Sequence, residues 1–138
     1  MGAAMAPAAA ETLLRFFARS GRRPEDYDAI YTGDLGFVGS RLLLEILQSE
    51  GLPLQNHQDC GLLLYDRARQ QVKAGGSGAG CSAAVLAAHI LPGLAKGQLH
   101  RVLLLSTGAL MSQTTFLQGE SIPGIAHLVE LLAPSTPV

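Results

Sequence analysis

The segment Ala74-Gly75-Gly76-Ser77-Gly78-Ala79-Gly80-Cys81-Ser82-Ala83-Ala84-Val85-Leu86-Ala87-Ala88-His89-Ile90-Leu91 joins a run of glycines to a stretch of small and apolar residues. Because glycine has no Cβ, the backbone of this run can come close to a ligand or to another part of the chain. The apolar stretch predicts a helix whose first N–H groups point back toward the glycines. Unpaired N–H groups and the positive end of a helix dipole favour an anion. The segment therefore predicts a site for a carboxylate, a phosphate or an oxyanion.

The predicted helix carries apolar side chains around most of its circumference. Alanines 83, 84, 87 and 88 allow close approach on one side, and Val85, Leu86, Ile90 and Leu91 fill the other. A helix that is apolar all round is buried on both faces, so we expect it in a central layer. Pro92 removes an N–H group and predicts a kink or an end near Leu91, with a last turn that finishes at Gly97.

Two common functions of glycine-rich loops do not fit this segment. A phosphate-binding P-loop needs Gly-Lys-Ser/Thr at its end, and here Cys81 and Ser82 follow Gly80. A dinucleotide fingerprint needs a different glycine spacing and an acidic residue about twenty positions later. A purely structural interpretation, in which the glycines only let a buried helix pack closely, stays open.

Composition limits the class of protein. The chain has 138 residues, of which 48% are hydrophobic and 5% aromatic, and a net charge of −1, which predicts one globular α/β domain over residues 1–138. Lysine and arginine are scattered, so we expect no nucleic-acid partner. Cys60 and Cys81 are predicted to be free thiols in a reducing compartment. We expect no signal peptide, and no apolar run reaches the roughly 18 residues of a membrane span.

The order of predicted elements alternates helices with strands. We expect a helix at 8–20 with Pro7 in its first turn, a strand at 27–32, a helix from 38 to about 51, a polar loop at 55–60, a buried strand at 62–65, the helix at 81–97, a strand at 101–106, a polar loop at 108–119 and a last strand at 125–131.

Five motifs resemble the C-terminal half of the stage V sporulation protein AD family. They are Met1-Gly2-Ala3-Ala4-Met5-Ala6-Pro7-Ala8-Ala9, Thr32-Gly33-Asp34-Leu35-Gly36, Asp59-Cys60-Gly61, Ala74-Gly75-Gly76-Ser77-Gly78 and Gly119-Glu120-Ser121-Ile122-Pro123-Gly124-Ile125-Ala126-His127. The resemblance implies half of a thiolase-like fold, with a mixed, mostly parallel sheet and a buried central helix. It also implies a sporulation protein that binds dipicolinic acid and works with other proteins of a channel complex, peripherally on the cytoplasmic face of the spore inner membrane.

The resemblance further implies that an N-terminal half, and the first strand of this half, are missing from the chain. In the family the motif at residues 1–9 is internal. A central helix without its opposite half leaves an apolar surface exposed. We therefore expect the chain to self-associate or to bind the missing half.

The resemblance also bears on catalysis. Condensing enzymes of this superfamily have a histidine after one strand of this half and a histidine or asparagine in the glycine loop. Neither residue occurs in Tyr31–Asp34 or in Gly75–Ser77, so we expect a catalytically inactive protein without a cofactor. One alternative is a divergent acyltransferase that uses Cys81 at a helix N-terminus or completes its site with another chain. Another is a purely structural subunit.

The ligand site is predicted from residues with suitable donors and acceptors. Dipicolinate has two carboxylates, which suit the N–H groups of the glycine loop, while acidic side chains suit its calcium chelate. A zinc site at His57, Asp59 and Cys60 lacks a fourth ligand, so no resident metal is expected. The predicted ligand contacts are Asp34, Asp59, Gly75, Gly76, Ser77, Gly78 and Cys81, to which Ser82 and Thr107 add hydroxyl groups.

Overall fold

The computed structural model describes residues 1–74 and 80–135. Its elements are α1 (Gly2–Ser20), a 3-10 turn η1 (Pro24–Asp26), β1 (Ala29–Thr32), α2 (Gly36–Ser49), β2 (His57–Asp59), α3 (Cys60–Leu64), α4 (Gly80–Val85), a π-helical turn η2 (Leu86–Ile90), α5 (Leu91–Ala95), β3 (Arg101–Ala109), α6 (Gln113–Leu117) and β4 (Gly124–Leu132).

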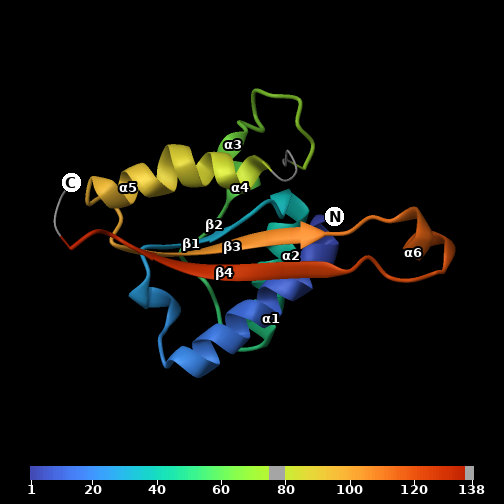
Figure 1. The fold of residues 1–138 in the computed structure, drawn as a ribbon, viewed down its shortest axis with the longest axis horizontal. Helices are drawn as coiled ribbons and strands as arrows, with labels where there is room; N and C mark the ends of the chain where they lie inside the picture. Colours follow the sequence, from blue (N-terminus) through green and yellow to red (C-terminus); the bar gives the residue numbers. More distant parts are fainter. Residues whose placement is uncertain (75–79, 136–138) are drawn as a thin grey trace.

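The elements form three layers around a four-stranded sheet with strand order β2-β1-β3-β4. β1 pairs in parallel with both β2 and β3, and β4 is antiparallel to β3. Figure 1 shows α1 and α2 on one face of the sheet and α3, α4 and α5 on the other. The predicted α/β class, with a mixed and mostly parallel sheet, is confirmed.

Each face of the sheet has its own hydrophobic core, because successive side chains of a strand point to opposite faces. Ile30 and Leu103 face α1 and α2, where they pack with Leu13 and Leu43. On the other face the core contains Tyr31, Val102, Leu104, Cys60, Cys81, Val85, Ile90 and Leu94.

The long helical segment at residues 80–95 contains a π-helical turn just before Pro92. Its buried residues are Cys81, Val85, Ile90 and Leu94, so the spacing along the buried row is four, five and four. The extra residue lies in the π-helical turn, where the Leu91 N–H donates to the Leu86 carbonyl. The departure from α geometry thus begins at Leu86, before the predicted position near Leu91. The predicted ending is confirmed, because Gly97 has a φ of 68°.

The prediction that this helix is buried on both faces is wrong for this chain. Ala83, Ala84, Ala87 and Ala88 are exposed, and Leu91 is 47% exposed. The helix covers one face of the sheet, and within the described residues no layer packs on its other side. We call these five residues the alanine face.

Helix α1 begins at Gly2, six residues before the predicted start, and Pro7 lies inside it. Tertiary packing explains the longer helix, because Met5 and Ala6 are buried in the core between α1, α2 and the sheet. The first turn also lies directly on α2. A Cβ on Gly39 would be 2.8 Å from the Gly2 carbonyl oxygen, so two glycines allow this helix crossing.

Two predictions for residues 55–65 are wrong. His57–Asp59, within the predicted loop, is the strand β2, and the predicted strand at 62–65 is largely helix α3. The reason is local: the Asp59 side chain accepts hydrogen bonds from the N–H groups of Gly61 and Leu62, which is a helix N-cap. β1 is also shorter than predicted and begins at Ala29.

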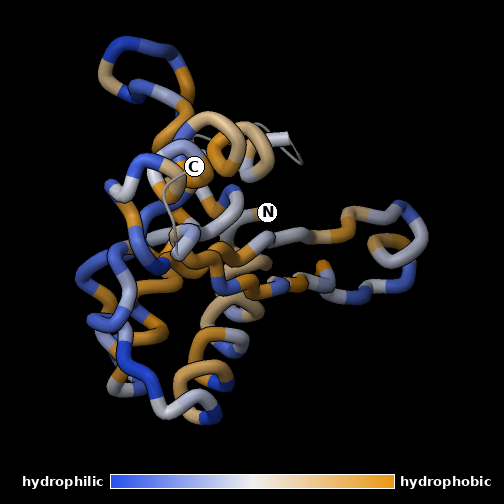
Figure 2. The backbone as a smooth tube through the Cα atoms, turned by 60° about the vertical axis from the view of Figure 1, so that its left-hand side comes forward, coloured by the Kyte–Doolittle hydropathy of each residue, from blue (hydrophilic) through white to orange (hydrophobic). Residues whose placement is uncertain are grey.

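The last two strands form a long hairpin. β3 and β4 are paired without interruption from Arg101↔Leu132 to Ala109↔Gly124, so both strands are longer than predicted. The predicted loop at 108–119 contains the end of β3 and the helix α6. Figure 2 shows the hairpin extending away from the helical layers. Across residues 1–74 and 80–135, no helix has both the length and the apolar character needed to cross a membrane.

Candidate functional site

Most of the predicted site residues that the structure describes lie at the carboxyl ends of the parallel strands. Asp34 follows β1, Asp59 ends β2, and Thr107 lies in the last part of β3. Cys81 lies in the first turn of α4, which Figure 1 shows above the sheet. Ligands of open α/β sheets bind outside this edge, because the loops there are held by the strands. The sheet topology therefore brings Asp34, Asp59 and Thr107 to one edge.

Asp59 is buried and bonded to the chain itself. Its two carboxylate oxygens accept hydrogen bonds from the hydroxyl of Thr32 and from the N–H groups of Leu35, Gly36, Gly61 and Leu62, at 2.7 to 3.3 Å. The carboxylate thus caps α3 and also lies at the start of α2. Burial raises the pKa of Asp59, and these hydrogen bonds oppose that rise. A direct ligand contact at Asp59 would require these bonds to break, so the geometry gives Asp59 a positioning role.

His57 and Asp59 are connected through the hydroxyl of Thr32. His57 Nε2 lies 2.9 Å from Thr32 Oγ1, and that hydroxyl lies 2.7 Å from Asp59 Oδ2. The hydroxyl has one proton, which it donates to the carboxylate, so its oxygen accepts from an Nε2–H group on His57. Burial lowers the pKa of His57 to about 4. His57 is therefore a neutral imidazole at physiological pH, with its tautomer set by Thr32.

The two cysteines lie close together in the core above the sheet. Cys60 is 0% exposed and Cys81 is 1% exposed. Burial raises the pKa of Cys60 to about 12, and the Cys81 thiol and the carboxylates of Asp59 and Asp34 act in the same direction. Neither cysteine is part of a disulfide bond. A reactive cysteine needs an accessible thiolate, which this environment opposes.

Asp34 lies between the ends of β1 and β3. Its N–H donates to Thr107 Oγ1 at 3.2 Å, and its carboxylate lies against Gly61 at the start of α3. Gly33 permits this arrangement, since a Cβ there would be 2.9 Å from the Thr107 nitrogen. Asp34 is only partly buried. Of the two predicted acidic contacts, Asp34 is thus the one that a ligand can reach.

The four predicted contacts Gly75, Gly76, Ser77 and Gly78 lie outside the described residues. The residues that flank them are described. The Phe37 N–H in the first turn of α2 donates to the Ala74 carbonyl at 2.7 Å, and α4 begins at Gly80. The glycine segment therefore connects a point on α2 with the helix that carries the alanine face.

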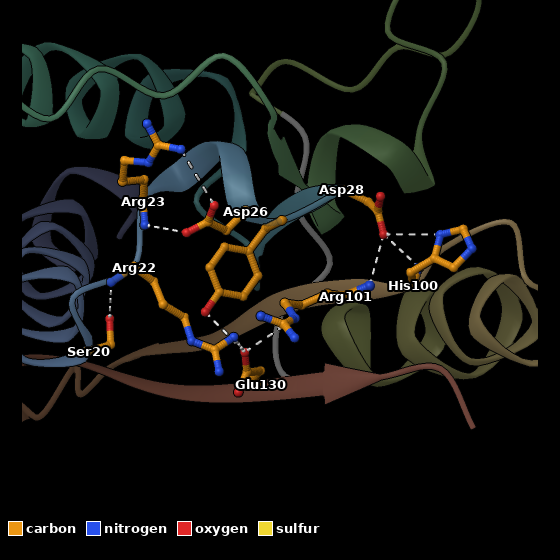
Figure 3. Close-up of polar contacts among 9 residues, drawn as sticks. Ser20, Arg22, Arg23, Asp26, Asp28, His100, Arg101 and Glu130 are labelled. Carbon is orange, nitrogen blue, oxygen red and sulfur yellow. Dashed lines mark hydrogen bonds and ion pairs between the residues drawn. The ribbon is translucent and has the colours of Figure 1, made fainter. Parts of the chain in front are cut away.

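A second polar network lies at the other end of the sheet, and sequence reasoning did not find it. Glu130 Oε1 accepts from Arg22 at 2.7 Å and from the Tyr27 hydroxyl at 3.0 Å, while Asp28 Oδ2 accepts the N–H groups of His100 and Arg101 (Figure 3). The hydrogen bonds from Arg101 and His100 lower the pKa of Asp28. This network connects η1 and β1 to the start of β3.

The histidines differ in their surroundings. His89 is exposed, and its Nε2 lies 3.3 Å from the Tyr31 hydroxyl. His100 is exposed beside Asp28. In residues 1–74 and 80–135, no three metal-binding side chains come together as a candidate metal site.

Sequence comparisons identify the family. The family model of Stage V sporulation protein AD matches residues 1–132, a range that begins before α1 and ends with β4. Stage V sporulation protein AD of Bacillus subtilis (strain 168) is 52% identical over 128 residues, which cover 92% of this chain and 38% of that relative. The chain spans well under half the length of that relative. The match nevertheless includes every strand and helix described above, so this chain belongs to the stage V sporulation protein AD family.

Proposed function

We propose that this chain is a catalytically inactive, thiolase-like part of a sporulation protein that binds dipicolinic acid. In this proposal it works with the remaining part of the family's longer chain and with the other proteins of a channel complex. The complex would act at the cytoplasmic face of the spore inner membrane, with this chain as a peripheral component. Family membership is the basis for the sporulation role, and the resemblance described above is the basis for the ligand.

The observation that carries this proposal is the arrangement of Asp34 and Thr107 at the carboxyl edge of the sheet. They come from two different strands, are joined by a hydrogen bond, and are held in place by the capped helix starts around Asp59. A partly exposed carboxylate beside a hydroxyl suits a metal-chelated dicarboxylate better than a free dianion, because calcium prefers carboxylate oxygens. The glycine segment would add N–H donors to the same ligand.

The state of the thiols supports a binding function over the acyltransferase alternative. Nucleophilic catalysis by cysteine needs a thiolate beside a general base. Cys81 is buried, and His57 at this edge already donates to Thr32. An acyltransferase would need a rearrangement that exposes Cys81 and frees a base for it.

The alanine face supports assembly with another part of the protein. Small side chains let a second helix approach closely, and Leu91 beside them is half exposed. In a thiolase-like arrangement the opposite half would cover this surface. The isolated chain would then self-associate through the same residues.

The test is calorimetric titration of dipicolinate into this chain combined with the N-terminal part of the Bacillus subtilis relative, with and without calcium. We expect binding that is tighter with calcium and weakened about tenfold by Asp34→Asn. Asp66→Asn, in the exposed turn after α3, is the matched control. We also expect Gly76→Val to weaken binding, because a β-branched side chain restricts the glycine loop.

Each result discriminates between functions. Binding that Asp34→Asn and Gly76→Val leave unchanged would assign the ligand site to the other part of the protein and leave this chain as a structural subunit. Hydrolysis or transfer of an acyl thioester that is lost in Cys81→Ala would favour the acyltransferase.

A further inference from the structure

The outer edge of β4 is an open sheet edge with a basic groove beneath it. β4 is the last strand in the sheet order β2-β1-β3-β4, and Figure 1 shows it as the outermost strand. An open edge presents N–H and C=O groups that another strand can pair with.

The register identifies the free groups. Leu110 N–H donates to the Pro123 carbonyl, and Ala133 N–H donates to the His100 carbonyl. Odd-numbered residues of β4 therefore face β3, because residues alternate along an antiparallel ladder. The even-numbered residues, from Gly124 to Leu132, direct their N–H and C=O groups outward.

Few of these outward groups have a partner. The Ala126 carbonyl accepts from the Thr12 hydroxyl at 2.9 Å. In the part of the chain that the structure describes, the other backbone groups of Ala126, Leu128 and Glu130 that point outward have no partner outside the sheet. β4 also lacks three features that often protect an edge, since its nine residues contain no proline, no lysine and no bulge.

The groove beneath this edge is lined by one stripe of α1. Thr12, Arg15, Phe16, Arg19 and Ser20 form one wall, Ala126–Leu128 form the other, and the volume is about 490 Å³. Positions 12, 15, 16 and 19 follow helical spacing and lie on one helix face. Side chains from an added strand would enter this groove wherever they point toward α1.

The charge of the groove favours acidic side chains. Within the described residues, Arg15 is 70% exposed and pairs only with Glu11, and Arg19 has no ion-pair partner. Further along, Arg22 pairs with Glu130. The opposite face of the edge is apolar, because Ile125 is 52% exposed and Val129 is 50% exposed. The two faces of the edge thus suit two different kinds of side chain.

We propose that the outer edge of β4 binds an extended partner segment in which acidic and apolar residues alternate, added antiparallel to β4. The acidic side chains lie in the groove beside Arg15 and Arg19, and the apolar side chains lie against Ile125 and Val129. Backbone hydrogen bonds to the even-numbered residues of β4 hold the segment, as in other cases of strand addition.

A second copy of the chain fits this edge less well. Pairing of β4 with β4 of another copy would place both α1 helices on the same face of the joined sheet. Arg15 and Arg19 of one copy would then face those of the other, and like charges at close range oppose pairing. An acidic segment removes that repulsion.

The test uses the full 138-residue chain and short fluorescent peptides, with binding measured by anisotropy. An alternating valine–glutamate peptide should bind at least about tenfold more tightly than an alternating valine–lysine peptide. The Arg15→Gln/Arg19→Gln double variant should bind the glutamate peptide about three- to tenfold more weakly. Arg41→Gln/Arg69→Gln, which removes two exposed arginines elsewhere, should bind it as the original chain does.

Methylation of the peptide backbone tests the pairing itself and leaves the protein unchanged. In antiparallel addition, the residues that hydrogen-bond to β4 have their side chains on the α1 face, so they are the glutamates. N-methylation of the glutamates should therefore abolish binding, and N-methylation of the valines should leave it largely intact.

Three results would overturn the proposal. The first is that the glutamate and lysine peptides bind equally well, or that neither binds. The second is that methylation of the valines abolishes binding while methylation of the glutamates does not. The third is self-association of the chain through β4 that excludes the peptide. Sedimentation of the chain with and without peptide measures the last of these.

Discussion

Thr32 on β1 and Asp59 at the end of β2 are joined by a buried hydrogen bond of 2.7 Å. Both residues are nearly inaccessible to solvent. Since Thr32 also accepts from His57, one hydroxyl connects a neutral imidazole to the carboxylate that caps α3 and meets the start of α2. The carboxyl edge of the sheet thus depends on three side chains from two adjacent strands.

Replacement of Thr32 by valine should destabilise the fold without changing its shape. The variant keeps the volume of the side chain but leaves His57 Nε2–H and one oxygen of Asp59 without this partner in a buried place. The expected loss is about 1–3 kcal/mol in the free energy of unfolding, measured by urea denaturation. Thr114→Val, at an exposed position of α6, should change it by less than about 0.5 kcal/mol. Equal losses of stability in Thr32→Val and Thr114→Val would contradict the role of the Thr32 hydroxyl in joining His57 to Asp59.

His57 should make the protein less stable in mild acid. Its pKa falls from 6.5 to about 4 on folding, so the unfolded chain binds more protons between these values and the free energy of unfolding decreases as pH falls. The decrease should be about 2 kcal/mol between about pH 7 and pH 5. His57→Gln can still donate to Thr32 and should show a flatter profile.

The raised pKa of Asp59 has the opposite effect on the pH dependence of stability. The folded state binds the Asp59 proton at a higher pH than the unfolded state does, so this group increases the free energy of unfolding as pH falls. The original chain and the His57→Gln variant both contain Asp59. The difference between their profiles of stability against pH therefore reports the titration of His57. Parallel profiles would show that His57 does not titrate as described.

Both cysteines should resist modification in the folded chain. Cys60 and Cys81 are buried, which keeps a reagent from reaching them, and the pKa of Cys60 is raised to about 12, so little Cys60 thiolate is present near neutral pH. Reaction with an aromatic disulfide should be at least about a hundredfold slower than in urea, where both thiols react. Fast labelling of Cys81 in the folded chain would revive the acyltransferase alternative, and Cys81→Ala identifies the reacting residue.

A charge on the alanine face should block assembly. Ala87→Glu places a carboxylate in the middle of this face, and burial of an unpaired charge in an interface is costly. We expect it to abolish self-association and binding of the N-terminal part of the relative, as measured by sedimentation. Ala68→Glu, at an exposed alanine in the turn after α3, should leave both unchanged. Assembly that survives Ala87→Glu would place the interface elsewhere.

The hydrophobic pattern predicted the long elements of the fold. Helix α2, the strand at Arg101 and the last strand follow from apolar spacing alone, because their buried sides are continuous over many residues. The short elements depend on single polar contacts. A three-residue strand of His57–Asp59 has no apolar pattern, and α3 begins where it does because of the Asp59 cap.

The sequence predicted where the candidate site lies better than it predicted what each residue of the site does. The motif at Thr32–Gly36 placed Asp34 at a strand end, and the structure puts it there beside Thr107. The role of Asp59 could not be read from the sequence, because its partners at Leu35 and Gly36 are distant in sequence and meet it only through the β1–β2 pair. The hydrogen bond between the side chains of Thr32 and His57 depends on the same β1–β2 register.

The π-helical turn at Leu86–Ile90 has the character of a one-residue insertion. Regular α-helical spacing would need one residue fewer between Val85 and Ile90 to keep both facing the sheet. The extra residue lies next to Pro92, which cannot donate an N–H to the preceding turn, so regular hydrogen bonding was already interrupted there. Removal of one residue from this turn would therefore restore α-helical spacing and still leave Val85 and Ile90 facing the sheet.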